Sequence, residues 1–418
     1  MASTQRLLNP VLYVSYNGML DPLGQSQVIP YLKELSKLGV RFTLLSYERA
    51  PAFERDGQQR CRELGEELVR YGIEWHRLRY HQRPSLPATV FDVAAGVRLA
   101  SRLVRRNKIE MVHARAHIPA VIALALKRRF GIKMIFDIRG LMAEEYIDAG
   151  HWSPGSISSR VTKSMESRVL RATDGAVTLT NRLWAAMQSW PAVKTSIAHQ
   201  TIPCCIDLER FCFNDQSRAA RRAELGIGDR FVLVYSGSIG GWYMTEEMAS
   251  FFATLKRRRP GAFFLWLTTG PSSIVEGAMT KLGIEPSEYA VRSVAPADVS
   301  SFLSAGDAGI AFYRPGVSRL GTSPVKVSEY LACGLPVVIN AGIGDSDDLI
   351  TKEAVGSVVA GFNEAAYAGA LDTIEALARD VKATRSVTRE VAERLFDVRD
   401  TGVERYARLY ETVLNGPN

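Results

Sequence analysis

The chain has 418 residues, of which 46% are hydrophobic and 23% are charged, as is ordinary for a soluble globular protein with two or three domains. No window approaches the ~20 apolar residues that a membrane-spanning helix needs, so an integral membrane protein is not expected. The formal net charge of +8 favours anionic partners such as nucleotides, phosphate-bearing lipids or membrane surfaces. Nucleic acid is not expected, because the basic residues are spread out and no recognised binding motif occurs.

The first half of the chain alternates short apolar strands with amphipathic helices. Helices are expected at residues 28–38, 91–106, 118–130 and 156–172. Strands are expected at residues 10–15, 41–46, 73–78, 109–113, 133–137, 175–179 and 196–203. This alternation predicts an α/β domain with a parallel, doubly wound sheet.

A second series begins after a charged, Ala- and Arg-rich stretch at residues 207–228, which is typical of a junction between domains. Its strands are expected at residues 231–235, 263–268, 289–294, 308–312, 337–340 and 357–359. The chain ends in helices, including one at residues 403–414. We therefore predict two α/β domains of similar size that face each other across a cleft, a common place for ligands.

The cysteines and acidic residues give no sign of a metal or disulfide framework. The five cysteines are scattered and form no CxxC pair, which predicts reduced thiols in the cytoplasm. The N-terminus has no apolar core of the length of a signal peptide, so a cytoplasmic protein is expected. Residues 344–348 (GDSDD) look like a DxD metal motif, but a turn rich in Asx residues is the plainer interpretation. No metal is predicted.

The most informative stretch is SPVKVSEYLACGLPVVIN, residues 323–340. Ser323 is expected to cap a helix, and Gly334 suits its left-handed stop. Lys326 and Glu329 are three residues apart and share one face near the N-terminus of that helix, which already attracts anions. The lysine could bind a phosphate and the carboxylate could accept hydrogen bonds from sugar hydroxyls. The alternative is a surface ion pair on an ordinary αβ unit.

A glycine-rich turn, SGSIGG at residues 236–241, follows the apolar strand FVLVY and precedes a helix. This layout presents backbone N–H groups to phosphate. The spacing is not that of a dinucleotide-binding GxGxxG motif, and the lysine of a P-loop is missing. The alternative is a tight turn that needs small residues.

Two further segments follow strands in the first domain. The loop at residues 16–27 contains Gly24, which permits close backbone approach, and the polar side chain of Gln25. A polar loop after the first strand often contacts ligand, although a flexible surface loop is the alternative. Near the end of the fourth strand, Arg115 or His117 is expected to line the cleft.

Charge is also concentrated at residues 136–152, after the strand KMIF. Asp137 and Arg139 sit at the strand end and could bind a polar acceptor or act as acid or base. Glu144 and Glu145 are expected on a solvated helix face.

Together these segments resemble the GT-B glycosyltransferases, specifically the large retaining family called family 4. The resemblance is carried in order by LDPLGQSQVIPYLKELSKLGVRFTLLSYE, TIPCCIDLERF, LVYSGSIGGWYMTEEM and SPVKVSEYLACGLPVVINAGIGD. It implies a GT-B fold of two Rossmann-like domains around a central cleft. Residues 1–205 would bind the acceptor and residues 206–395 the nucleotide-sugar, while a helix at residues 396–418 would pack back on the first domain.

The resemblance implies that Glu329 binds the ribose hydroxyls of the donor. A second glutamate, eight residues earlier in the family, is replaced by Gly321, and the Arg and Lys that often follow the glycine-rich loop are absent. Lys326 is the candidate replacement, with Arg314 and Arg319 in reserve. The implied donor-binding residues are Ser236, Gly237, Ser238, Gly240, Ser293, Val294, Thr322, Ser323, Lys326 and Glu329, and the candidate catalytic residues are Lys326, Arg139 and Asp137.

The expected activity is the retaining transfer of a sugar from a nucleotide-sugar donor to a glycan or lipid-linked acceptor, in bacterial surface polysaccharide synthesis at the inner face of the membrane. Lys326 and backbone amides would stabilise charge on the leaving phosphate, so no cofactor is expected. Retention would proceed by front-face attack. The alternatives are an epimerase or phosphorylase of the same fold and a non-catalytic sugar-nucleotide-binding partner. A nicotinamide oxidoreductase is not expected, because the dinucleotide fingerprint is missing.

Overall fold

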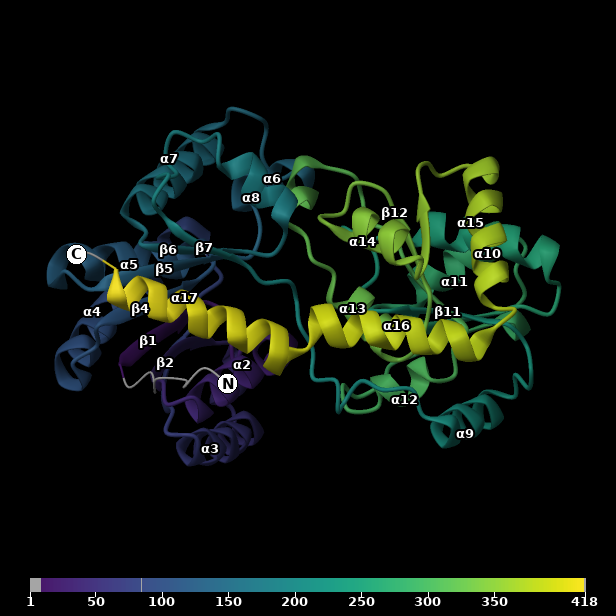
Figure 1. Ribbon diagram of the computed structural model, residues 1–418, viewed down its shortest axis with the longest axis horizontal. Helices are drawn as coiled ribbons and strands as arrows, with labels where there is room; N and C mark the ends of the chain where they lie inside the picture. Colours follow the sequence, from purple (N-terminus) through teal and green to yellow (C-terminus); the bar gives the residue numbers. More distant parts are fainter. Residues whose placement is uncertain (1–8, 84, 417–418) are drawn as a thin grey trace. The chain divides into compact units, whose positions relative to one another are not determined.

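The computed structural model describes residues 9–83 and 85–416, and it divides the chain into two compact units. Unit 1 comprises Met1–Pro203 with Val398–Asn418, and unit 2 comprises Cys204–Asp397 (Figure 1). Each unit is built on one parallel sheet. Among the described residues, none of the helices has the length and apolar character that crossing a membrane requires.

Unit 1 has a seven-stranded sheet in the order β3-β2-β1-β4-β5-β6-β7. The strands are β1 (Pro10–Ser15), β2 (Arg41–Glu48), β3 (Glu74–Arg79), β4 (Met111–Arg115), β5 (Lys133–Ile138), β6 (Gly175–Thr178) and β7 (Ala198–Thr201). The helices are α1 (Pro22–Gln27), α2 (Ile29–Lys37), α3 (Arg55–Arg70), α4 (Ser85–Asn107), α5 (His117–Phe130), α6 (Met142–Asp148), α7 (Ile157–Ala172), α8 (Asn181–Met187) and α17 (Glu404–Asn415), with a short 3₁₀-helix η1 (Ala50–Phe53) and a π-helix η4 (Val398–Val403).

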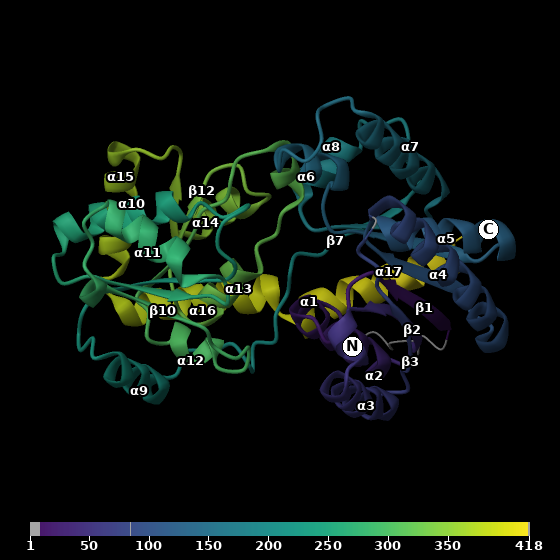
Figure 2. The ribbon, with the colours of Figure 1, turned by 180° about the vertical axis from the view of Figure 1, so that it is seen from behind.

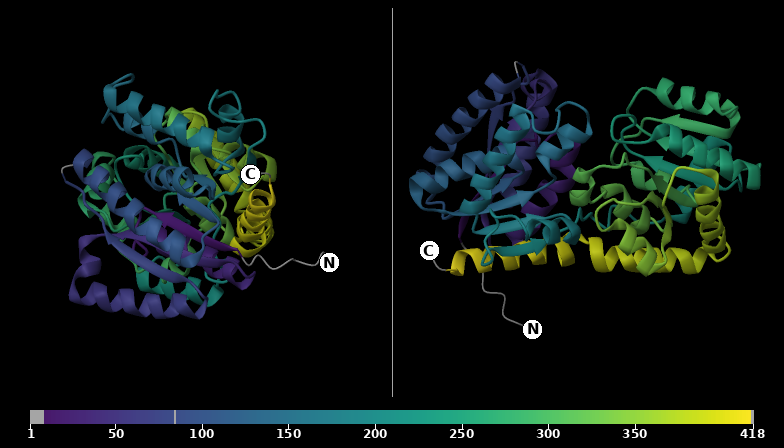
Figure 3. Two further views of the ribbon diagram at one scale, coloured as in Figure 1. Left: turned by 90° about the vertical axis from the view of Figure 1, so that its left-hand side faces the viewer. Right: turned by 90° about the horizontal axis from the view of Figure 1, so that it is seen from above.

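Helices cover both faces of this sheet, which explains why its strands are apolar runs rather than alternating ones. Helices α4, α5 and α7 pack side by side on one face (Figure 2), and α17 lies along β5 and β7 on the other (Figure 3). The strand order reverses between β1 and β4, so the ligand-binding edge expected for a doubly wound sheet lies at the carboxyl ends of these two strands.

Unit 2 has a six-stranded sheet in the order β10-β9-β8-β11-β12-β13. The strands are β8 (Val232–Ser236), β9 (Phe263–Leu267), β10 (Tyr289–Arg292), β11 (Ala308–Ala311), β12 (Val337–Asn340) and β13 (Gly356–Val359). The helices are α9 (Asp215–Leu225), α10 (Thr245–Arg258), α11 (Ser272–Lys281), α12 (Val299–Leu303), α13 (Val325–Ala332), α14 (Ser346–Glu353), α15 (Glu364–Leu377) and α16 (Val381–Phe396), with short 3₁₀-helices η2 (Pro286–Glu288) and η3 (Val317–Gly321).

The sheet of unit 2 separates two apolar cores. Val232 and Val234 of β8 point into the core beneath α13 and α16, whereas Leu233 and Tyr235 point into the core beneath α10, α11 and α15. This alternation follows from the two-residue period of a strand. The order reverses between β8 and β11, which places the ligand-binding edge at the carboxyl ends of these strands.

The parallel sheets of both domains were predicted correctly, but several local predictions were wrong. The loop predicted at residues 16–27 contains α1, and the Asx-rich turn predicted at residues 344–348 runs into α14. There the Asp347 carboxylate accepts hydrogen bonds from the backbone of Gly342 (2.9 Å) and Ile343 (3.3 Å). Within the described part of the chain, no group of three or more His, Cys, Asp and Glu residues could hold a metal ion.

Helix α13 also begins differently from the prediction. Its N-cap is Pro324, and the Ser323 hydroxyl accepts a hydrogen bond from the backbone of Cys204 (3.0 Å) instead of capping the helix. The predicted stop is confirmed, since Gly334 follows the helix with φ +77°.

Candidate functional site

In unit 2 the loops after β8 and β11 are joined by backbone contacts at the point where the strand order reverses. Tyr243 and Tyr313 form an isolated antiparallel bridge. On either side of it, Arg314 donates to the carbonyl of Trp242 (2.8 Å) and Met244 to that of Phe312 (3.1 Å). The two loops therefore form a fixed platform at the edge where a doubly wound sheet binds its ligand.

Lys326, in the first turn of α13, reaches this platform and is buried there, with 6% of the residue exposed. Its Nζ donates a hydrogen bond to the Tyr235 hydroxyl (3.2 Å). The same atom lies 3.8 Å from the ring centre of Tyr243, 4.6 Å from that of Tyr235 and 5.3 Å from that of Tyr313. Three aromatic faces thus surround the amine, an arrangement that favours a cation.

The lysine also touches the glycine-rich loop. A Cβ added to Gly237, whose φ is +139°, would lie 2.9 Å from Lys326 Nζ. At the next position back, the Ser236 amide donates to the Tyr330 hydroxyl of α13 (2.7 Å). The structure therefore brings together Ser236, Gly237 and Lys326, which the sequence had placed in one site.

Burial dominates the ionisation of the Lys326–Glu329 pair. It lowers the pKa of Lys326 to about 7, although the Glu329 charge opposes this shift. It raises the pKa of half-buried Glu329 to about 7, with Lys326 and Arg210 opposing. Near neutral pH both groups are therefore within their titration range, and a phosphate beside Lys326 would favour its charged form.

Arg319 supplies a second cation at the same loop. Its guanidinium lies 4.4 Å from the ring centre of Trp242, and only 6% of the residue is exposed. The carbonyl of Arg319 accepts hydrogen bonds from Thr322 (3.0 Å) and Gly344 (2.9 Å), which fixes the turn that leads into α13. By contrast, Arg314 is exposed.

Other residues predicted to bind the donor already use backbone polar groups in hydrogen bonds within the protein. The Gly237 amide bonds to the Leu267 carbonyl (2.9 Å), and the Gly240 amide to the Thr245 hydroxyl (3.4 Å), so both donors are already engaged. The Ser238 carbonyl accepts from the Tyr235 hydroxyl, while Ser238 itself is exposed.

Ser293 and Val294 follow β10, the edge strand, which is separated from β8 by β9. Two strand spacings amount to about 10 Å. These two residues therefore lie further from Lys326 than the glycine-rich loop does.

Unit 1 has a cavity of about 190 Å³ at the carboxyl ends of β1, β4 and β5. It is lined by Tyr16, Asn17, Ala116, His117, Ile118, Pro119, Arg139, Gly140, Met142 and Glu145. The cavity brings together Arg139 and His117, which were predicted separately. His117 Nε2 is held by a hydrogen bond to Glu166 Oε2 (2.8 Å).

Backbone strain occurs beside this cavity. Ala116, the N-cap of α5, has φ +69° and ψ −178°, a region that is essentially restricted to glycine. Its amide donates to the Asp137 carbonyl (2.9 Å). Strain of this kind clusters at ligand sites, which agrees with the position of Ala116 in the cavity wall.

Asp137 does not contact this cavity, and its predicted role as an acid or base is not supported. The residue is fully buried, and it accepts a hydrogen bond from Tyr406 of α17 (3.0 Å). Burial alone would raise its pKa, but Arg139, His113 and Arg115 outweigh burial and hold it far below the usual range. Asp137 therefore stays ionised and positions Arg139, whose Nη1 lies 3.5 Å from Asp137 Oδ1.

The structure also reassigns residues of the loop after β1. Gly24 packs against the backbone of Gly18 within the same loop, since an added Cβ would lie 2.3 Å from the Gly18 carbonyl oxygen. Gln25 donates to the Met19 carbonyl (2.6 Å). Both stabilise the loop rather than line the cavity.

Instead, Tyr16 and Asn17 line the cavity, and sequence reasoning missed them. Their position directly after β1 was the available signal. Glu145, which was expected on a solvated face, also lines the cavity, whereas Glu144 pairs with Lys163 (2.7 Å).

Comparisons with known proteins agree with this architecture. Residues 27–199 match a family model described as a glycosyl transferase 4-like domain, and residues 320–397 match a glucosyltransferase 3-like C-terminal domain. None of the curated proteins compared with the chain matches it.

Three solved structures illustrate the fold. A glycosyltransferase from Rickettsia africae ESF-5 is 14% identical with a TM-score of 0.73, and the match covers 98% of this chain and 100% of that one. HepE from Anabaena, in complex with UDP and glucose, is 14% identical with a TM-score of 0.69, over 97% and 100% of the chains. WaaG, involved in lipopolysaccharide biosynthesis, is 15% identical with a TM-score of 0.68, over 97% and 100%. At these identities the likeness establishes the fold.

Proposed function

Because the chain is a glycosyltransferase of the GT-B fold and belongs to family 4, we propose that unit 2 binds a nucleoside diphosphate sugar and that the sugar is passed to a glycan or lipid-linked acceptor. The role we propose for this transfer is bacterial surface polysaccharide synthesis. The observation that carries the proposal is the contact between the Lys326 amine and Gly237, with Glu329 one helical turn away.

This geometry suits a diphosphate. The phosphate groups lie against the loop at residues 237–242, where Lys326 and Arg319 both reach. Glu329 accepts hydrogen bonds from the ribose hydroxyls. The Anabaena structures of this fold that contain UDP or UDP-glucose support a donor of this chemical class.

In the proposed reaction an acceptor hydroxyl attacks the anomeric carbon on the face from which the phosphate leaves. A new carbon–oxygen bond forms as the bond to the diphosphate breaks, and the hydroxyl proton passes to a leaving phosphate oxygen. The configuration is therefore retained. Lys326 and Arg319 stabilise the negative charge that develops on the leaving phosphate. In other enzymes a metal ion stabilises this charge, and the reaction that we propose uses no metal ion.

The acceptor is proposed to bind in the unit 1 cavity, where Arg139 and His117 offer polar contacts. Two solvent-facing apolar residues of α7, Ile157 and Val161, are 82% and 61% exposed, and the basic residues Arg160 and Lys163 are exposed beside them. A helix side of this kind suits an anionic membrane surface. It supports a lipid-linked acceptor at the inner face of a membrane.

The test is a thermal-shift screen of nucleotides and nucleotide-sugars against the wild-type chain and the Lys326→Met and Glu329→Gln variants. A ligand that binds the native state raises its melting temperature. We expect at least one nucleoside diphosphate sugar to stabilise the wild type, and neither variant to show the full shift. Equal shifts in all three proteins would overturn the site assignment.

The donor identified in this way is then incubated with lipid extracts. Sugar transfer that depends on the extract supports a transferase, whereas conversion of the donor sugar without any acceptor indicates an epimerase.

A further inference from the structure

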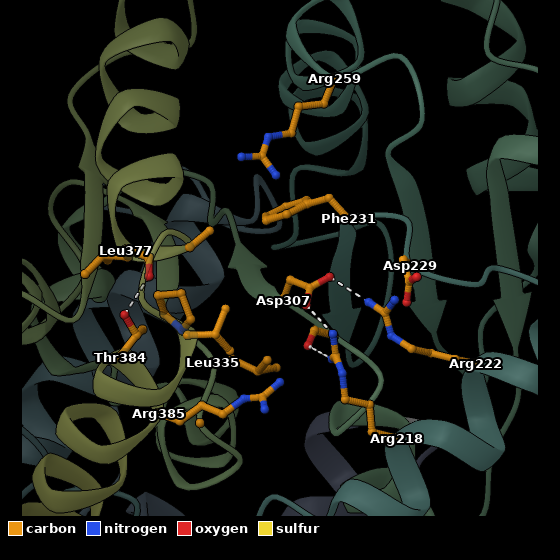
Figure 4. Close-up of a pocket in the computed structure, with 15 residues that line it drawn as sticks. Arg218, Arg222, Asp229, Phe231, Arg259, Asp307, Leu335, Leu377, Thr384 and Arg385 are labelled. Carbon is orange, nitrogen blue, oxygen red and sulfur yellow. Dashed lines mark hydrogen bonds and ion pairs between the residues drawn. The ribbon is translucent and has the colours of Figure 1, made fainter.

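Unit 2 has a cavity of about 210 Å³ at the edge of its sheet opposite the glycine-rich loop (Figure 4). Phe231, Asp307 and Pro336 in its wall directly precede β8, β11 and β12, so the cavity lies at the amino ends of these strands. The glycine-rich loop follows the carboxyl end of β8, and five residues of strand span about 16 Å. The two sites are therefore distinct.

The wall of this cavity is strongly basic. Its charged residues are Arg218, Arg222, Arg259, Arg385, Asp229 and Asp307. Four arginines and two aspartates leave an excess of two positive charges around a small space. The remaining wall is mostly apolar and includes Phe231, Leu335 and Leu377.

Two of the arginines maintain the wall itself. Arg218 and Arg222 lie on either side of the Asp307 carboxylate, with N–O distances of 2.6 and 2.7 Å. Arg222 also donates to the carbonyls of Ala305 (3.1 Å) and Gly228 (2.7 Å). Asp307 is thus paired on both sides, and it offsets the charge at Arg385 only in part.

Arg385 of α16 is different. Its guanidinium stacks 3.6 Å from the ring centre of Phe213, and Figure 4 shows it directed toward Arg218. In the described ranges 9–83 and 85–416, no carboxylate or carbonyl accepts a hydrogen bond from it. Burial, Arg218 and Arg222 lower the pKa of Arg385 and outweigh the opposing charges of Asp307 and Asp215, so a bound anion would stabilise the charged guanidinium.

Arg259 approaches from another side of the cavity (Figure 4). Its guanidinium lies 5.0 Å from the ring centre of Phe231 and 3.6 Å from Glu375 Oε1. This ion pair is longer than a hydrogen bond, so Arg259 retains the capacity to bind another acceptor.

We propose that this cavity binds a small phosphate monoester, with its phosphoryl oxygens on Arg385 and its hydroxyl-bearing body extending toward Arg259. Guanidinium groups bind phosphate in a bidentate manner, and such charge-assisted hydrogen bonds are the stronger kind. The apolar wall formed by Leu335 and Leu377 covers the body of the ligand. The volume admits a phosphate with a sugar-sized substituent.

The test is isothermal titration calorimetry of the full chain with inorganic phosphate and with glucose 6-phosphate, and with glucose as the uncharged control. We expect both phosphates to bind and glucose not to bind. Arg385→Gln should weaken binding about tenfold or more, as the loss of a charge-assisted hydrogen bond implies. Arg259→Gln provides a second variant at the cavity.

Arg394→Gln is the matched control, because it removes an exposed arginine of the same helix that pairs with Glu353 (2.6 Å). Its phosphate affinity should equal that of the wild type. Unchanged binding in both the Arg385 and Arg259 variants would overturn the proposal. Binding that is lost instead in Lys326→Met would place the phosphate in the donor site, and would also overturn it.

Discussion

The amine of Lys326 lies against Gly237, so closely that a Cβ added to this glycine would be 2.9 Å from Nζ and 3.1 Å from Cε. Two features therefore require glycine at this position: the close approach of Lys326 and a φ of +139°, which disfavours any other residue. This relationship joins the loop after β8 to the start of α13, and it is the centre of the donor site that we propose for unit 2.

Gly237→Ala should therefore abolish most donor binding without unfolding the chain. The added methyl group displaces the Lys326 amine from the surrounding tyrosines, and the backbone conformation costs about 1–3 kcal/mol more for alanine. We expect a loss of transfer activity and of nucleotide-sugar binding, measured by product formation and by calorimetry.

Gly241→Ala is the control for this variant. Gly241 also has a positive φ, of +60°, but an added Cβ would meet nothing within 4 Å. A similar loss of binding in both variants would show that strain or added bulk in the glycine-rich loop, rather than contact with Lys326, is responsible.

Donor binding should be coupled to proton uptake above neutral pH. The pKa of Lys326 is lowered to about 7 by burial, so above that pH the free amine is mostly uncharged, whereas Glu329, whose pKa is raised to about 7, is mostly ionised. A bound diphosphate favours the charged amine and raises this pKa, so each complex takes up a proton. Affinity should then fall as the pH rises above 7, by up to about tenfold per unit.

Calorimetry in buffers of different ionisation enthalpy measures the number of protons taken up. The Lys326→Met variant should show weaker binding with no such uptake from this group. Proton uptake of equal size in the variant and the wild type would contradict the assignment.

The sequence predicted the two parallel sheets because strands buried on both faces, such as β8 and β12, are continuous apolar runs. It did not predict how distant segments use individual polar groups. The Ser323 hydroxyl meets the Cys204 amide 119 residues away, and Asp137 meets Tyr406 269 residues away. The residue type of Ser323 suggested a helix cap, and the position of Asp137 at a strand end suggested a catalytic carboxylate. In the structure, contacts with distant segments give both residues a structural role instead.

Asp137→Asn should destabilise unit 1 substantially. The Nη1 atoms of Arg115 and Arg139 lie 3.4 and 3.5 Å from the Asp137 carboxylate. Without this carboxylate, buried Arg115 and half-buried Arg139 lose their negatively charged partner. Breaking a buried ion pair by removing one partner costs about 3–5 kcal/mol. The shift is measured by urea denaturation followed through hydrogen exchange of β4 and β5.

Glu144→Gln is the comparison, since it removes a more exposed ion pair with Lys163 and should cost at most about 1 kcal/mol. If Asp137 instead acts in proton transfer, Asp137→Asn would abolish activity while leaving stability nearly unchanged.

Ala116→Gly should stabilise unit 1. The alanine has φ +69° and ψ −178°, and relief of such strain is worth about 1–3 kcal/mol, against about 0.4–1 kcal/mol lost to the greater freedom of glycine in the unfolded chain. We expect a net gain of about 1 kcal/mol in the free energy of unfolding. Ala354→Gly, at the ordinary left-handed position φ 53°, ψ 37°, should gain less. An equal or smaller effect at Ala116 would show that its conformation is not strained.

The exposed apolar residues of α7 should determine membrane binding. Ile157→Ser with Val161→Ser removes two side chains that are 82% and 61% exposed, so the fold should be retained. Burying each in a membrane interface contributes up to about 1.5–3 kcal/mol, so the double variant should bind anionic vesicles about tenfold or more weakly.

Vesicle co-sedimentation at low and high salt measures this loss. The basic residues Arg160 and Lys163 should make wild-type binding depend on anionic lipid and decrease with salt, because screening weakens attraction to the surface. Val69→Ser, which removes a residue of α3 that is 69% exposed, should leave vesicle binding unchanged. Wild-type binding to neutral vesicles that does not respond to salt would refute the electrostatic part, and equal binding by the α7 variant would refute the apolar part.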